Sequence, residues 1–271
     1  MTSIVYVADT LGRRHPVLRT TLAKALAEVG GRIDEIQDTR DIWCRDYMPV
    51  PLGEGRFVQF VYKPDYLADE PELITPPEVA EQIVGTARRS ELVVDGGNVV
   101  RRGRVAVVTD KVFAENPRLS RSQVMQQLSA DLEIDRLVVI PVEPGDVCGH
   151  ADGVLHLLDE RTALVNDYSD VDPDYGARLG LALRDRGIES IPMSYAPDLK
   201  SRRRMPPATG VYVNLLEMAE AIFVPVYGIE SDDDAVRVLA GVFGGRAVVP
   251  IDCRGIAREG GSLHCVTCTR T

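Results

Sequence analysis

Residues 260–268 read GGSLHCVTC, a short stretch that combines a glycine pair, a histidine and two of the five cysteines of the chain. Segments at the end of a chain usually fray unless other parts of the fold hold them. Cys265 in this stretch has several possible roles: a small buried hydrophobic residue, a metal ligand, half of a redox pair with Cys268, or a nucleophile. The glycine pair favours the nucleophile, because glycine lets a backbone or a substrate approach closely.

Polar clusters of a similar kind recur along the chain at intervals of roughly 50 to 60 residues, which is a repeat-like spacing. They lie at residues 43–46 (WCRD), 95–98 (DGGN), 150–152 (HAD), 212–214 (YVN) and 264–265 (HC). Helix-like segments separate most of them. Five strand-and-helix units around a shared axis would bring all five clusters together. The sequence therefore predicts an α/β fold with five repeated units, whereas without this repeat the same alternation would indicate a doubly wound sheet.

Hydrophobic periodicity predicts the individual elements. Strands are expected at residues 3–8, 56–62, 91–94, 105–109, 136–141, 153–158, 163–166, 189–194, 210–216, 221–227, 247–251 and 262–267. Helices are expected at residues 17–29, 77–88, 120–132, 175–186 and 231–243. No linker or low-complexity segment divides the chain, so we expect one domain over residues 1–271.

Composition excludes several classes of protein. The net charge of −10 argues against a nucleic-acid partner, which needs clustered basic residues, and is more compatible with a cationic small substrate. The apolar runs are too short for a membrane span, and the first residues lack the pattern of a secretory signal. Five cysteines without dense spacing do not form a disulfide framework, so we expect a cytoplasmic protein with reduced thiols.

His150 and Asp152 form the first candidate pair for acid–base chemistry. At a strand end, residues two apart point to the same face, and a histidine beside a carboxylate is a common acid–base pair. A turn with solvated side chains is the competing interpretation. Asp95 precedes a second glycine pair, and on its own this motif indicates a turn between strands.

Trp43, Arg45 and Asp46 form another candidate group, because a planar cation can lie over the only tryptophan of the chain. In isolation, the same residues read as a core tryptophan beside a surface ion pair. Asn214 stands in an apolar segment, where its amide needs hydrogen-bond partners or a substrate.

A zinc site is the competing use of these residues. Cys148, His150, His264, Cys265 and Cys268 would supply enough ligands. Structural zinc sites usually show two short ligand pairs, and here only the two cysteines at 265 and 268 have that form. We therefore expect no metal and no other cofactor.

Taken together and in this order, the motifs WCRD, DGGN, GHADG, YVN and GGSLHC resemble the guanidine-modifying (pentein) superfamily. Within it, the sequence is similar to the family of agmatine deiminases and Porphyromonas-type peptidylarginine deiminases. The resemblance extends from about Trp43 to Cys265. It implies a pentein fold, which is a five-bladed α/β propeller with pseudo-fivefold symmetry, with a final strand whose end carries the nucleophile.

The resemblance also implies roles for the candidate residues. Cys265 is expected to be the nucleophile, and Asp46 and Asp152 the carboxylates that hold a guanidinium group. His150 is expected to be the general acid and base, oriented by Asp95 where the family more often has Glu. Substrate contacts are expected from Trp43, Arg45 and Asn214, and a structural role from Cys268.

The implied reaction is a cysteine-dependent hydrolysis of a guanidino compound through a thiouronium intermediate. An amidinotransferase with the same chemistry and a propeller that only binds guanidino ligands remain alternatives. The expected partner is a cationic guanidino molecule or an arginine-containing peptide, and the question of a homodimer stays open. Lys111 and the basic residues 200–204 could bind a substrate carboxylate, although surface charge is the simpler interpretation.

Overall fold

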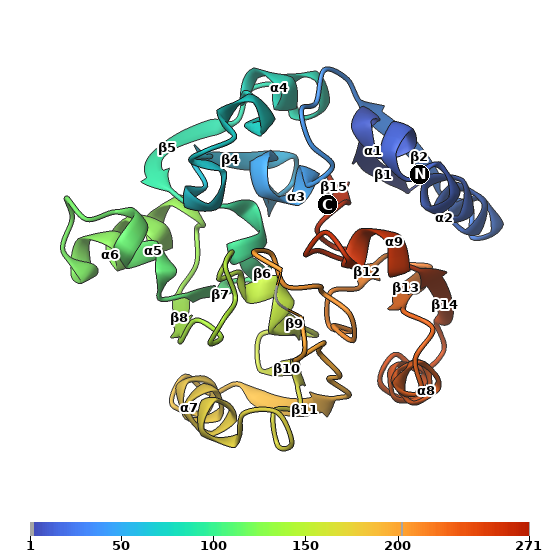
Figure 1. Ribbon diagram of the computed structural model, residues 1–271. Coiled ribbons are helices and arrows are strands. Elements are labelled where there is room, and N and C mark those ends of the chain that lie inside the picture. Colours follow the sequence, from blue (N-terminus) through green and yellow to red (C-terminus); the bar gives the residue numbers. More distant parts are fainter. Residues whose placement is uncertain (1–2, 202, 271) are drawn as a thin grey trace.

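The computed structural model describes residues 3–201 and 203–270. Within these residues the strands form five three-stranded sheets, which stand around a central axis with helices on the outside (Figure 1). We call each sheet, with the helices that connect its strands, a blade. The five-unit α/β architecture expected from the recurring clusters is confirmed.

All five blades share one connectivity. Their central strands pair antiparallel with an inner strand near the axis and parallel with an outer strand. The inner strands are β15 (Cys268–Thr269), β3 (Val50–Gly53), β6 (Val100–Arg102), β9 (Leu155–Leu157) and β12 (Leu216–Glu217). The central strands are β1 (Ile4–Ala8), β4 (Arg56–Val61), β7 (Val105–Thr109), β10 (Thr162–Asn166) and β13 (Ala221–Val226). The outer strands are β2 (Arg32–Ile36), β5 (Arg88–Val93), β8 (Arg136–Ile140), β11 (Glu189–Met193) and β14 (Ala247–Asp252).

Helices connect the central strand of each blade to its outer strand, as a parallel pair requires. In chain order these are α1 (Asp9–Arg14) with α2 (Pro16–Glu28), α4 (Glu78–Val84), α5 (Lys111–Glu115) with α6 (Arg121–Asp131), α7 (Pro173–Arg184) and α8 (Ser231–Val242). The connections between strands also contain the short helices α3 (Cys44–Tyr47), α9 (Arg254–Ala257), η1 (Asp65–Leu67), η2 (Pro71–Leu73), η3 (Gly96–Asn98) and η4 (Ala151–Gly153).

Local sequence explains where the long helices begin and end. Helix α2 starts at Pro16, which suits the first helical position, and Gly30 follows its end with a φ of 80°. Leu18, Leu22 and Leu26 lie on one face of α2 and are buried in the largest core cluster. Helix α6 begins with a capping box.

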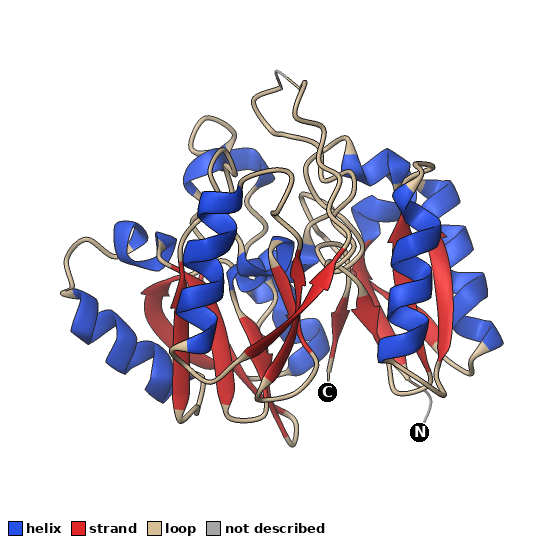
Figure 2. Ribbon diagram, turned by 90° about the horizontal axis from the view of Figure 1, so that it is seen from below, coloured by secondary structure: helices blue, strands red, loops and turns tan. Residues whose placement is uncertain are grey.

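The ring closes between the two ends of the described chain. Strand β15 pairs antiparallel with β1, so that Val5 faces Thr269 and Tyr6 faces Cys268. The first blade is therefore built from both ends of the sequence, whereas the other four blades are continuous. In Figure 2 both ends of the chain lie on one face of the molecule and long loops gather on the opposite face.

Two predicted strands are wrong. Residues 210–216 form turns, with a single bridge between Val211 and Tyr195, and only Leu216 belongs to a strand. Residues 262–267 also form turns, and the closing strand starts at Cys268. Both segments are buried at many positions because they cross the centre of the ring, so their apolar pattern reflects packing rather than strand pairing.

The other predicted strands and helices are present, most of them with shifted ends, and residues 105–109 match β7 at both ends. The prediction omitted β2, β3, β6, β15 and short helices, which include α3 beside the axis. No helix within residues 3–201 and 203–270 is long and apolar enough to cross a membrane.

The packing of α2 gives a direct test of the core. We expect Leu22→Ala to lower the free energy of unfolding by about 2–5 kcal/mol, because Leu22 is completely buried and truncation leaves a cavity. Val17→Ala on the same helix is the control, since Val17 is 79% exposed and a change of no more than about 0.5 kcal/mol is expected. Urea unfolding of both variants measures the difference, and equal losses would contradict the assigned core.

Candidate active site

Each polar cluster of the sequence lies on the connection from the outer strand of one blade to the inner strand of the next. These five connections meet near the axis, and four of them line a cavity of about 480 Å³. Six predicted site residues line it: Trp43, Asp46, His150, Asp152, Asn214 and Cys265. Asp95 lies directly behind His150. The repeat in the sequence is therefore a repeat of connections that converge on one site.

His150 lies between two carboxylates. Its Nε2 atom is 3.1 Å from Asp95 Oδ2, and its Nδ1 atom is 3.5 Å from Asp46 Oδ1. Burial alone would lower the pKa of His150, but the charges of Asp46 and Asp95 raise it to about 10. The imidazole is therefore protonated at neutral pH and can donate a proton.

The glycine turn of η3 holds the Asp46 side chain through a backbone hydrogen bond. The backbone N–H of Gly97 donates to Asp46 Oδ1 at 3.1 Å. Burial raises the pKa of Asp46 to about 8, and the neighbouring His150 lowers it only in part. A second cation beside Asp46 would favour its ionised form further.

Asp152 is held by a different histidine. His264 Nδ1 is 2.8 Å from Asp152 Oδ2, and Asn214 Nδ2 donates to the backbone oxygen of Asp152 at 3.1 Å. Burial would raise the pKa of Asp152, but the hydrogen bond from His264, together with the positive charges of His150 and Arg45, lowers it overall. Burial and Arg45 lower the pKa of His264 to about 4, so the ring is neutral and its Nδ1–H can donate to the carboxylate.

The Cys265 thiol lies beside Asp152 and Asn214. Its Sγ atom is 3.4 Å from Asn214 Oδ1 and 3.9 Å from Asp152 Oδ2. Burial and the charges of Asp152 and Asp46 raise the pKa of this thiol well above its ordinary value. A cation bound between the carboxylates would oppose both charges and favour the thiolate.

The glycine pair before Cys265 allows close packing, as expected. A Cβ atom on Gly261 would lie 2.3 Å from Cζ3 of Trp43, so only glycine lets the indole form a wall of the cavity here. Gly260 has a φ of 98°, which side chains disfavour, and a Cβ atom there would lie 2.3 Å from Cγ of Met205.

Arg45, for which a substrate contact was expected, is not among the residues that line the cavity. Its Nη2 atom donates to the Thr267 carbonyl at 2.8 Å, and its backbone N–H donates to the Cys265 carbonyl at 3.1 Å. Arg45 thus holds the segment around Cys265 in place through hydrogen bonds to its backbone carbonyl groups.

Cys268 and Lys111 have structural contacts. The sulfur of Cys268 is 3.6 Å from that of Cys44, and both side chains are buried.

Lys111 bonds to Asp65 at 2.9 Å and to the Cys148 carbonyl at 2.8 Å, with only 10% of its side chain exposed. Lys111 is therefore a buried ion-pair partner rather than a surface charge.

The basic segment 200–204 stays on the surface at its described positions. Lys200, Arg203 and Arg204 are exposed, while Arg202 lies outside the described residues. Arg203 bonds to the Arg258 carbonyl at 3.0 Å.

The sequence prediction missed several residues of the site. His264 was considered only as a metal ligand, although its position directly before Cys265 was an available signal. No sequence signal pointed to Tyr66, whose ring packs edge-on against His150 at 6.1 Å, or to Glu143 at the opposite wall. Within the described residues, no three His, Cys, Asp or Glu side chains are grouped so that they could hold a metal ion.

Comparisons with known proteins find a matching family model and related sequences. Residues 2–270 match the family model of Porphyromonas-type peptidyl-arginine deiminase. Agmatine deiminase of Pseudomonas fluorescens is 24% identical over 315 residues, which cover 97% of this chain and 85% of that protein. A putative agmatine deiminase of Mycoplasma capricolum is 23% identical over 289 residues, with 90% and 78% covered.

Solved structures show the same fold. A cysteine-to-serine variant of C. jejuni agmatine deiminase with substrate bound superposes with a TM-score of 0.79 at 15% identity, covering 99% of this chain and 93% of that one. A dimethylarginine dimethylaminohydrolase superposes with a TM-score of 0.62 at 15% identity, covering 99% and 100%. The pentein propeller expected from the motifs is therefore confirmed.

The electrostatics of the thiol can be tested by alkylation. We expect Asp152→Asn to lower the pKa of Cys265, because it removes a negative charge that opposes the thiolate. At a fixed pH of about 7.5, iodoacetamide should then modify Cys265 faster, by roughly tenfold for each unit of pKa lost.

Cys148 is an internal control in the same cavity, because burial and Asp146 chiefly raise its pKa. Mass spectrometry of the two cysteine peptides measures both rates in one sample. An unchanged ratio of the rates would contradict the assigned influence of Asp152.

Proposed function

Because this chain belongs to the Porphyromonas-type peptidyl-arginine deiminase family, we propose that it hydrolyses the guanidinium group of a small cationic compound of the agmatine type, with Cys265 as nucleophile. The products are a ureido compound and ammonia. Residues from Trp43 to Cys265 line the one cavity, so we also propose that residues 1–271 act as one catalytic domain.

One observation carries the proposal. A thiol, two carboxylates and a protonated histidine converge on a single cavity, from three separate connections of the ring. A guanidinium carbon is a poor electrophile, so its hydrolysis needs precise placement of a nucleophile and a proton donor. This geometry supplies both.

The first role of the site residues is to hold the substrate. Asp46 and Asp152 grip the nitrogens of the guanidinium through charge-assisted hydrogen bonds, and Trp43 forms a flat wall for the planar group. The bound cation opposes the negative charges around Cys265 and so lowers the pKa of the thiol. Asn214 and Arg45 position the thiol.

The second role of the site residues is to form the covalent adduct and to transfer protons. The Cys265 thiolate attacks the guanidinium carbon, and His150 donates its proton to the nitrogen that leaves as ammonia. A thiouronium adduct remains on Cys265. His150 then takes a proton from water, which attacks the adduct, breaks the carbon–sulfur bond and releases the ureido product.

The lining of the cavity favours a substrate without a carboxylate. Among the described residues that line it, none is Lys or Arg. Free arginine would bring a carboxylate close to Glu143, Asp146 or Asp172, whereas an amine at that end would be attracted. An agmatine-type compound suits this cavity better than arginine.

The nucleophile can be tested with two cysteines that are close in sequence. We expect wild-type protein to release ammonia and ureido product from agmatine faster than from arginine, methylarginines or an arginine peptide. Cys265→Ala should abolish product, because no other group replaces the sulfur in the adduct. Cys268→Ala should keep activity, since Cys268 lies away from the cavity, against Cys44.

Activity in Cys265→Ala, or its loss only in Cys268→Ala, would overturn the assignment. Amidine transfer to an added amine in preference to water would indicate an amidinotransferase. Stabilisation by the ligands without product would indicate a binding protein.

The role of Asp95 predicts a shift in pH dependence. Asp95 raises the pKa of His150, so activity should fall only as the pH rises toward about 10, where His150 loses its proton. Asp95→Asn removes this stabilisation of the imidazolium, and the alkaline limb of kcat should move to lower pH.

The control is Asp198→Asn, a carboxylate of the same cavity that accepts a hydrogen bond from the Lys200 backbone. It should leave the alkaline limb in place. A general loss of activity in Asp95→Asn without any displacement of the limb would show that Asp95 does not tune His150.

A further inference from the structure

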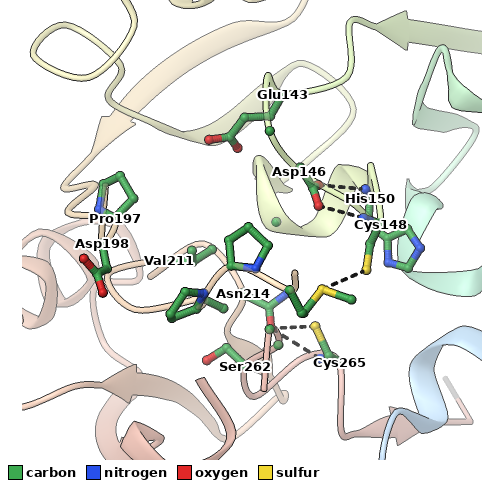
Figure 3. A pocket seen from close by; sticks show the side chains of 18 of the residues that line it. Glu143, Asp146, Cys148, His150, Pro197, Asp198, Val211, Asn214, Ser262 and Cys265 are labelled. Carbon is green, nitrogen blue, oxygen red and sulfur yellow. Dashed lines mark hydrogen bonds between the residues drawn. The ribbon is translucent and has the colours of Figure 1, made fainter. Parts of the chain in front are cut away.

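Figure 3 shows the Glu143 carboxylate at the wall of the cavity opposite Cys265. Two tyrosines bind this carboxylate. Glu143 accepts hydrogen bonds from Tyr195 at 2.5 Å and from Tyr168 at 2.8 Å. The two rings contact each other edge-on with centroids 5.0 Å apart. We call these three residues, Glu143, Tyr168 and Tyr195, the distal wall.

The distal wall is a part of the fold that the reaction does not use. Glu143 follows strand β8, while Tyr168 and Tyr195 follow the neighbouring strands β10 and β11. The proposed mechanism assigns no step to any of them. The phenol hydroxyls fix the carboxylate in one orientation, which is a property of a binding group rather than of a mobile surface acid.

The charge around the distal wall is negative and lacks basic partners. Asp146 and Asp172 are near enough to raise the pKa of Glu143, in addition to the effect of burial. Asp146 accepts from backbone N–H groups of the 148–150 turn, and Asp172 accepts from the Tyr175 N–H at the start of α7. Among the ion pairs of the described residues, none joins these three carboxylates to a Lys, Arg or His.

The cavity gives an independent reason to expect a ligand at the distal wall. It runs without interruption from Cys265 to Glu143, and its volume of about 480 Å³ lies in the range of sites for organic ligands. Pro144, Pro197 and Pro207 supply apolar surface along its sides, which suits a chain of methylene groups. A substrate with its guanidinium beside Cys265 therefore extends toward Glu143.

We propose that the distal wall is a second cation subsite, in which Glu143 binds the free ammonium or amidinium end of a dicationic substrate. This inference rests on the proposed function, which places the guanidinium group beside Cys265. It adds Glu143 as the residue that binds the cation at the other end of the substrate. Glu143 supplies the charge-assisted hydrogen bond, and the hydroxyls of Tyr168 and Tyr195 hold its carboxylate in place.

The test compares two substrates that differ only in the second cation. Agmatine carries an amine at the end of its chain, whereas n-butylguanidine ends in a methyl group. We expect Glu143→Gln to lower kcat/KM for agmatine on the order of tenfold to a hundredfold, mainly through KM, because a hydrogen bond to a charged group is lost. The value for n-butylguanidine should stay within about twofold, since no contact with its far end depends on charge.

Two controls separate recognition from structure. Asp198→Asn removes another carboxylate of the cavity and should preserve the ratio between the two substrates. Tyr168→Phe keeps the carboxylate and should reduce the preference for agmatine less than Glu143→Gln does. Longer guanidinoalkylamines, assayed with wild-type protein and Glu143→Gln, show which chain length reaches the distal wall.

An equal loss for both substrates in Glu143→Gln would overturn the subsite, because Glu143 would then support the fold or the chemistry in general. An unchanged preference for agmatine would overturn it as well. If wild-type protein hydrolyses neither compound, the proposed function fails. The subsite is then judged by thermal stabilisation with 1,4-diaminobutane. A shift in Tm that Glu143→Gln abolishes supports the subsite, and an equal shift in both proteins overturns it.

Discussion

The position of His150 between two carboxylates is the interaction on which the rest of the site depends. Asp46, Asp95 and Asp152 are buried close together, and their mutual repulsion would be costly without a cation. The protonated imidazole neutralises part of this charge in the resting protein. The net negative charge that remains attracts a second planar cation, while the same charge keeps the Cys265 thiol protonated until that cation arrives. In the proposed mechanism, substrate binding and activation of Cys265 are therefore one electrostatic event.

Such close convergence requires residues without side chains at the contact points. A Cβ atom on Gly96 would lie 2.1 Å from the Arg45 carbonyl oxygen, and one on Gly97 would lie 2.6 Å from Asp46 Oδ1. Gly261 meets Trp43 in the same way. These glycines have no unusual backbone angles, so their role is to let two connections of the ring touch. Arg45 then holds the last connection in place through carbonyl groups, which an arginine can do with several donors at once.

The sequence predicted the parts of the molecule that repeat or pair locally. The five clusters indicated five units, and most central strands and long helices followed from their hydrophobic period. The segments around Asn214 and Cys265 were taken for strands because residues that cross a packed centre are as apolar as strand residues. Glu143 and Tyr66 could not be found, because their place at the cavity depends on how distant connections meet. Arg45 was misplaced for the same reason, since its neighbours Trp43 and Asp46 do line the cavity while its own side chain turns behind the thiol.

The closure of the ring between β1 and β15 links catalysis to the order of synthesis. Val5 and Thr269 pair across almost the whole sequence, so the first blade must wait for the last residues before it is complete. The turn that carries Cys265 lies three residues before this pairing. In a nascent chain, the carboxylates and His150 therefore emerge before Cys265 and before β15, the strand that completes the first blade. Contacts of such high sequence separation also tend to form slowly, because the cost of closing the loop comes before the contact.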